Sequence, residues 1–169
     1  MPTIGVAIAI PEPWASELQD YRASLGDPTA ARIPTHITLI PPADLDESAL
    51  EAVEDHLSSV AGSIQPFDIH MRGTGTFRPV SPVVFVTVAK GISGCEQLAG
   101  AVRRGPLEVD LHYPYHPHVT IAHHLDDAAL DRAFAELAGF ECRFTAEEFS
   151  LYVHDETAGW QPTRDFGLG

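Results

Sequence analysis

The chain has 169 residues, and its 10 Lys and Arg against 24 Asp and Glu give a formal net charge of −14 with neutral histidine. Hydrophobic residues make up 44% and charged residues 20%, which is typical of a folded globular domain and excludes a disordered chain. Binding to long nucleic acid relies on many Lys and Arg contacts to phosphate, and this chain has too few basic residues for an extended nucleic-acid surface. A small phosphorylated ligand held by a few local groups remains compatible with this composition.

The two cysteines, Cys95 and Cys142, cannot form a disulfide framework and have no CxxC spacing, so we expect two small buried thiols. The apolar run near the N-terminus ends at Pro11 and has no basic segment before it. Such a run is too short for a membrane span and is a poor signal peptide. We therefore expect a cytoplasmic protein that does not contact a membrane.

The first half of the chain begins with residues 4–10 (IGVAIAI), whose branched apolar side chains predict a buried strand. Residues 14–25 have helical character, and Gly26 follows them as a C-terminal stop. The later segments of this half are predicted as a strand at 35–40, a helix at 46–61, and two short strands at 67–71 and 74–77 separated by glycines.

The second half repeats this order. Its segments are predicted as a strand at 83–89, a helix at 94–104, a strand at 118–122, a helix at 126–138 with Asp126 or Asp127 as N-cap, and strands at 140–144 and 149–153. Each half therefore follows the order β-α-β-α-β-β, and we place the two sequence repeats at about 3–79 and 82–155.

We predict an α+β fold in which the duplicated β-α-β-α-β-β unit forms two pseudo-symmetric lobes with antiparallel-rich sheets around a central cleft. No Gly/Ser-rich linker separates the halves, so residues 1–169 are expected to form a single bilobal domain. The C-terminal tail, 156–169, is rich in turn residues, and it fits either a final edge strand or a closing flap. We expect a monomer.

The tetrapeptide HITL, which begins at His36, recurs as HVTI, which begins at His118, at the same place in the second half. On a strand the side chains alternate between faces, so His36 and Thr38 point the same way, and so do His118 and Thr120. The apolar residues between them point into a core. Residue frequencies predict one such match roughly 0.01 times in a chain of this composition, so two matches at equivalent places indicate function.

Two imidazoles and two hydroxyls in one cleft suit phosphodiester cleavage. A neutral imidazole can take a proton from water, and an imidazolium can give a proton to the leaving oxygen. The threonine hydroxyls can donate hydrogen bonds to the non-bridging phosphate oxygens. This set needs no metal and no cofactor, and unperturbed histidines predict a bell-shaped pH–rate profile with its maximum near neutrality.

The paired motifs, about 80 residues apart in a duplicated α+β chain, resemble the two-histidine (2H) phosphoesterase superfamily, in particular its bacterial 2′-5′ RNA ligase and cyclic phosphodiesterase branch. The flanking segments that carry the resemblance are RIPTHITLIPP, YHPHVTIAHH and GTGTFRPVSPVVFVTV. The resemblance implies a bilobal fold with a central cleft. It also implies 2′,3′-cyclic phosphates or 2′-5′ linkages as substrates, so the expected partner is a small cyclic-phosphate nucleotide or an RNA terminus.

The resemblance also implies roles for the motif residues. His36 and His118 are the expected catalytic residues, with His118 as the base and His36 as the acid, although a substrate bound in the reverse sense would exchange these roles. Thr38 and Thr120 are the expected ligands of the substrate phosphate. The expected activity is metal-independent hydrolysis of 2′,3′-cyclic phosphate, with 2′-5′ RNA ligation as the reverse reaction.

Four further residues near the motifs are candidate substrate contacts. Arg32 and Arg78 are the basic candidates, and each could instead be a solvated surface group. Tyr113 and Tyr115, just before the second motif, could stack on a base or could pack in the core or at its rim.

Two other hypotheses remain. In the first, the chain is a zinc-dependent hydrolase whose ligands come from His112, His116, His118, His123 and His124. A proline interrupts the strand pattern inside this cluster, and no cysteine or carboxylate completes a familiar ligand spacing. In the second, the chain is a nucleotide- or RNA-binding module that performs no chemistry. Both motifs are intact, which favours the enzyme.

Overall fold

The computed structural model describes residues 1–111 and 113–169. Its strands are β1 (Thr3–Ala9), β2 (His36–Asp44), β3 (Phe67–Thr76), β4 (Val83–Lys90), β5 (His118–His123), β6 (Glu141–Ala146), β7 (Glu148–Asp155) and β8 (Gly159–Gly167). Its α-helices are α1 (Trp14–Ser24), α2 (Leu50–Ser63), α3 (Ile92–Val102) and α4 (Asp127–Glu136), and three short 3₁₀ turns are η1 (Ala30–Arg32), η2 (Glu47–Ala49) and η3 (Gly105–Leu107).

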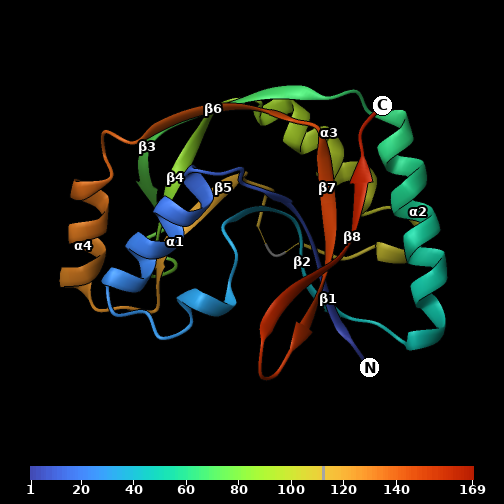
Figure 1. Ribbon diagram of the computed structural model, residues 1–169, viewed down its shortest axis with the longest axis horizontal. Coiled ribbons are helices and arrows are strands. Elements are labelled where there is room, and N and C mark those ends of the chain that lie inside the picture. Colours follow the sequence, from blue (N-terminus) through green and yellow to red (C-terminus); the bar gives the residue numbers. More distant parts are fainter. Residues whose placement is uncertain (112) are drawn as a thin grey trace.

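The strands form two four-stranded antiparallel sheets, one in the order β2-β1-β7-β8 and the other in the order β5-β4-β3-β6. Each sheet combines strands from both halves of the chain, because β3 pairs with β4 and β7 pairs with β1. Helix α4 packs on the second sheet and α2 packs against β8, so these helices lie at opposite ends of the molecule (Figure 1). The predicted α+β class with antiparallel sheets is confirmed.

The motif strands β2 and β5 are edge strands of their respective sheets, and they pack against each other. The apolar motif residues are completely buried, as the alternation predicts: Ile37, Leu39, Val119 and Ile121 are each 0% exposed. Burial of such side chains contributes about 1.5–3 kcal/mol each. The core therefore anchors both motifs and leaves the His and Thr side chains on the opposite face.

The structure corrects the prediction for residues 67–77 and decides between the two alternatives for the C-terminal tail. The two short strands predicted at 67–71 and 74–77 are one strand, β3, with an irregular register against β4. Gly73, with φ of 73°, lies at this irregularity without ending the strand, because β4 pairs with residues on both sides of it. The C-terminal tail forms the edge strand β8, which pairs along the length of β7.

Two local predictions are also confirmed, the N-cap of α4 and the burial of the two cysteines. Asp126 is the N-cap of α4, and its side chain accepts a hydrogen bond from the Ala129 amide. Cys95 and Cys142 are both buried thiols, and burial raises the pKa of Cys95 to about 12. Within 1–111 and 113–169, no helix combines the length and the apolar character that crossing a membrane requires.

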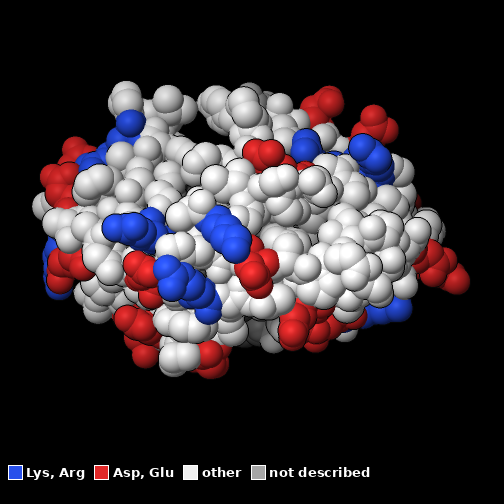
Figure 2. All heavy atoms as spheres, turned by 90° about the horizontal axis from the view of Figure 1, so that it is seen from above, with Lys and Arg blue, Asp and Glu red and all other residues white. Residues whose placement is uncertain are grey.

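Charges are mixed on the molecular surface. On the face drawn in Figure 2, Lys and Arg side chains lie next to Asp and Glu. Several of the basic side chains are paired, as in Lys90 with Asp68 and Arg143 with Glu141. The acidic composition is therefore accompanied by local ion pairs, which are worth little individually at an exposed surface.

Candidate active site

The two motif histidines have the same local geometry. The Nδ1 atom of His36 lies 2.6 Å from the carbonyl oxygen of Pro34, and Nδ1 of His118 lies 2.7 Å from the carbonyl oxygen of His116. Each strand begins at its histidine, so these carbonyls lie outside the strand ladder and are free to accept. A carbonyl can only accept a hydrogen bond, so Nδ1 carries the proton and Nε2 is left for a ligand.

The two motifs lie next to each other in the structure. Besides the packing of β2 on β5, the hydroxyl of Tyr115 donates a 2.7 Å hydrogen bond to the carbonyl oxygen of Thr38. This bond ties the segment before the second motif to the strand of the first. The charge of a protonated His36 also lowers the pKa of His118.

Burial lowers the pKa of both motif histidines. For His118 the value falls to about 4, because burial and the positive charges of His116 and His36 outweigh the hydrogen bond to the His116 carbonyl. For His36, burial is again the main cause, the Pro34 carbonyl opposes it, and the charge of Arg22 lowers the pKa further. Both rings are therefore neutral at pH 7 in the free protein, with Nε2 available as a base.

Two phenylalanines bury the ring of His118. The Phe77 ring is 5.0 Å from it between centroids at an interplanar angle of 88°, and the Phe85 ring is 5.1 Å away. The edge-to-face contact with Phe77 helps to fix the orientation of the imidazole. The two phenylalanine rings also explain the low pKa of His118, since apolar rings cannot solvate the charged imidazolium.

The ring of His36 borders a pocket that is open to solvent. The residues that line the pocket are Gly5, Val6, Ala7, Pro34, His36, Thr38, Ile40, Pro42, Tyr152 and Trp160. Tyr152, Trp160 and the two phenylalanines against His118 are not among the site residues predicted from the sequence. Phe77 and Phe85 could have been proposed from the sequence, because they are aromatic residues in or beside predicted strands. No local pattern in the C-terminal tail indicates that Trp160 lies near the site.

The motif threonines are half-buried, and each lies on the same face of its strand as the motif histidine. Thr38 lines the pocket beside His36, and Thr120 stands opposite Phe85 in the β4–β5 register. Across residues 1–111 and 113–169, neither hydroxyl makes a hydrogen bond to the protein. Both hydroxyls can therefore donate to a ligand without breaking an existing bond.

The two basic candidates, Arg32 and Arg78, have different surroundings. Arg32 is exposed at the end of η1, and its backbone packs closely on Gly159, where φ is 82°. Arg78 is bound to α4, since its Nη1 lies 2.8 Å from a carboxylate oxygen of Asp131 and 3.8 Å from one of Asp127. The structure thus pairs Arg78 with helix α4.

The two tyrosine candidates, Tyr113 and Tyr115, differ in their exposure to solvent. Tyr113 is 70% exposed. Tyr115 is half-buried and donates to the Thr38 carbonyl, and burial raises the pKa of its phenol, so the hydroxyl stays protonated as a donor. Tyr115 therefore contacts the first motif from the second half of the chain.

The histidine cluster of the zinc hypothesis is only partly described, because His112 lies outside the described residues. The rings of His116 and His118 are 5.7 Å apart between centroids, and His123 stacks on His124 at 3.6 Å. In the described part of the chain, no group of three or more His, Cys, Asp or Glu side chains is arranged to hold a metal ion.

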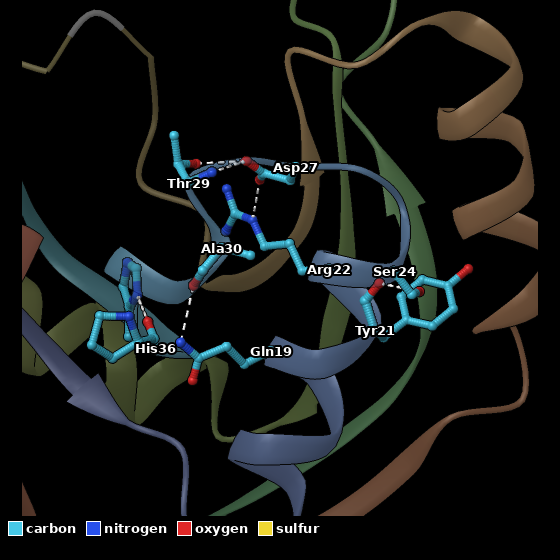
Figure 3. A network of polar contacts seen from close by, with 9 residues as sticks. Gln19, Tyr21, Arg22, Ser24, Asp27, Thr29, Ala30 and His36 are labelled. Carbon is cyan, nitrogen blue, oxygen red and sulfur yellow. Dashed lines mark hydrogen bonds and ion pairs between the residues drawn. The ribbon is translucent and has the colours of Figure 1, made fainter.

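A buried ion pair supports the segment that leads to His36. Nε of Arg22, on α1, lies 2.8 Å from Oδ2 of Asp27, and their side chains are 9% and 5% exposed. Asp27 also accepts from the amide and hydroxyl of Thr29, at 2.8 and 2.6 Å. Figure 3 shows this network beside the segment that runs through Ala30 to His36.

We expect Asp27→Ala to lower the free energy of unfolding by about 3 kcal/mol, because it leaves a buried guanidinium without its partner. Burial alone would raise the pKa of Asp27, but hydrogen bonds from Thr29 and Arg22 outweigh it and hold this pKa below its ordinary value. The contribution of ionised Asp27 to the free energy of unfolding is therefore fully present above the pKa of Asp27 in the unfolded state. It is lost as the pH falls through the pKa of Asp27 in the folded state. Urea unfolding of both proteins at pH 7 and pH 3 measures it, and equal stabilities at pH 7 would contradict it.

Comparisons with known proteins identify the family. The model of the 2′-5′ RNA ligase superfamily matches residues 10–158. A relative from Bacillus cytotoxicus, named "Putative phosphoesterase", is 32% identical over 145 residues, covering 85% of this chain and 84% of that protein. A relative of the same name from Staphylococcus epidermidis is 29% identical over 169 residues, covering 98% of this chain and 99% of that protein.

Solved structures share the fold. The crystal structure of E. coli LigT complexed with NADP⁺ matches with a TM-score of 0.73 and 21% identity, and the match covers 99% of both chains. The structure of LigT complexed with 3′-AMP matches with a TM-score of 0.69 and 21% identity over the same share. At this identity the likeness shows the fold, and the family model supplies the assignment. The chain belongs to the 2′-5′ RNA ligase superfamily, in agreement with the resemblance of its two histidine-threonine motifs.

Proposed function

We propose that the chain is a metal-independent phosphodiesterase that hydrolyses the 2′,3′-cyclic phosphate of nucleotides or RNA ends, with 2′-5′ RNA ligation as the reverse reaction. The observation that carries this proposal is the matched pair of imidazoles, each held through Nδ1 and each offering Nε2. The solved complexes of E. coli LigT with NADP⁺ and 3′-AMP support a small nucleotide as the ligand.

In the proposed reaction His118 is the base and His36 is the acid. Nε2 of neutral His118 takes a proton from water as the water oxygen bonds to phosphorus. The bond from phosphorus to one ribose oxygen breaks, and Nε2–H of protonated His36 gives its proton to that oxygen. The product is a phosphate monoester, and exchange of one proton between each imidazole and solvent restores the starting state.

The low pKa of His118, about 4, suits the base, because this ring is already neutral when water must be activated. His36 must carry a proton at the same moment. An anionic cyclic phosphate between the two rings favours that proton, because a nearby opposite charge stabilises the imidazolium. The bound substrate itself therefore helps to charge the acid.

The activity is tested by incubation with 2′,3′-cyclic nucleotides and with RNA that ends in a cyclic phosphate, each in the presence of EDTA. We expect turnover in EDTA. Activity that disappears in EDTA and returns with Zn²⁺ would instead support the zinc hypothesis. Nucleotide binding without any turnover would support the binding module.

We expect Thr38→Ala and Thr120→Ala each to lower kcat/KM by about tenfold to a hundredfold, because each removes one hydrogen bond to a charged phosphate oxygen, worth about 1.5–3 kcal/mol. The matched controls are Thr38→Ser and Thr120→Ser, which keep the hydroxyl and should retain most of the activity. Steady-state kinetics on the four variants measures this. A serine variant as impaired as its alanine counterpart would show that packing of the methyl group, and not the hydroxyl, is what matters.

A further inference from the structure

The two sheets differ in the residue that stands beside each motif threonine. In the strand registers, Ala7 of β1 pairs with Thr38 in the way that Phe85 of β4 pairs with Thr120. Phe85 fills its side of the site, since a Cβ on the facing Gly75 would lie only 2.7 Å from the Phe85 ring. The pseudo-symmetric position on the other sheet holds a methyl group, so that side has space.

The pocket beside His36 occupies this space. Small residues, Gly5 and Ala7, contribute to its lining from β1, and Trp160 reaches it from β8. The indole packs on the glycine, because a Cβ at Gly5 would lie 3.4 Å from Cζ3 of Trp160. The ring of His154 supports the indole at 5.1 Å between centroids, in a T-shaped contact. Trp160 is therefore held in place and remains half-exposed.

The chemistry of the pocket suits a planar apolar ring. Apart from the motif residues His36 and Thr38, its side chains are aliphatic or aromatic, as in most small-molecule sites. Every nucleobase has a flat π-face, so any of the bases can stack on an aromatic side chain in a protein site. The His36 imidazole and the Thr38 side chain also line the pocket, so a ring within it lies beside the first motif.

We propose that this pocket is a nucleobase subsite in which the base of the cyclic nucleotide packs against Trp160. The proposal rests on the proposed function. It assigns the substrate's direction in a pseudo-symmetric site, because Phe77 and Phe85 fill the equivalent space beside His118. The nucleoside that carries the cyclic phosphate then lies on the His36 side, and its leaving ribose oxygen faces His36.

Kinetics on two substrates tests the subsite. One is a nucleoside 2′,3′-cyclic phosphate, and the other is methyl riboside 2′,3′-cyclic phosphate, which has no base. In the unmodified protein we expect the nucleoside substrate to have a kcat/KM about 5- to 150-fold higher, the range that corresponds to stacking of one base. Trp160→Ala should bring this ratio close to one, and Trp160→Phe should retain most of it. Phe134→Ala, at an aromatic residue on α4 that is 40% exposed, is the matched control and should leave the ratio unchanged.

A binding measurement separates the subsite from the reaction. The chain has two tryptophans, so in a Trp14→Phe background the fluorescence reports Trp160 alone. Titration with 3′-AMP should quench this fluorescence, and ribose 5-phosphate should not. Ala7→Phe, which copies the Phe85 side into the pocket, should abolish the quenching in a protein whose folding is confirmed by circular dichroism.

The outcomes are distinct. Quenching by 3′-AMP without turnover of either substrate would overturn the proposed function and retain the subsite. Turnover with a nucleoside-to-riboside ratio that Trp160→Ala leaves unchanged would retain the function and overturn the subsite. Loss of the ratio in Tyr113→Ala, and not in Trp160→Ala, would place the base beside Tyr113 and equally overturn the proposal.

Discussion

Replacement of His36 or His118 by alanine should lower turnover of a 2′,3′-cyclic nucleotide by about 10²–10⁴-fold in each case, the usual contribution of a general acid or base. Each ring is held through Nδ1 by a backbone carbonyl, so its removal takes away one Nε2 and leaves the strand intact. The loss should be in kcat more than in KM, because the proton is transferred in the transition state. Steady-state kinetics of the folded variants measures it.

The control for these variants is His124→Ala. His124 is exposed and follows β5, outside both motifs, so we expect its replacement to change turnover less than threefold. A folded His36→Ala or His118→Ala protein with nearly full activity would refute the two-histidine mechanism. Loss of activity in His124→Ala would point to the histidine cluster and therefore to zinc.

The second large effect is in the pH profile. Histidines with ordinary pKa values would give a maximum of kcat/KM near neutral pH, but burial lowers the pKa of both motif histidines. The base must be neutral, so kcat/KM should rise with pH until about pH 4, the pKa of His118. The acid must be protonated, so kcat/KM should fall above the pKa of His36, which lies below its ordinary value of 6.5. The maximum of kcat/KM is therefore expected on the acidic side of neutrality.

Above that window kcat/KM should fall about tenfold per pH unit. The profile of kcat should be displaced to higher pH, because the bound anionic phosphate raises the pKa of both imidazoles. Kinetics between pH 3 and 9, with circular dichroism at each pH to confirm folding, measures both profiles. A kcat/KM that increases up to pH 8 would contradict the assigned protonation states.

The motifs could be predicted from the sequence because their information is local. Alternation on a strand is enough to bury Ile37 and Val119 and to leave each histidine beside its threonine. The repeat of the motif in the second half then predicts that two such faces share a site. The α+β class follows from the same local signals, summed over the chain.

The rest of the site depends on pairings between distant segments. Trp160 reaches the pocket only because β8 pairs with β7, and β7 with β1. Arg78 turns to α4 because Asp131 lies there, more than 50 residues later in the chain. The pKa of His118 depends on burial beside Phe77, which follows β3, and Phe85, which lies in β4. No local pattern in the sequence contains these contacts.

The central claim is that the two imidazoles act together in a metal-free reaction, and a double-mutant cycle in EDTA tests it most directly. Turnover is measured for the unmodified protein, His36→Ala, His118→Ala and the double variant, with one 2′,3′-cyclic nucleotide at the optimal pH. Groups that act as a unit are not additive, so the double variant should be little slower than either single variant. Losses that multiply, so that the double variant is slower by the product of the two single effects, would contradict the account.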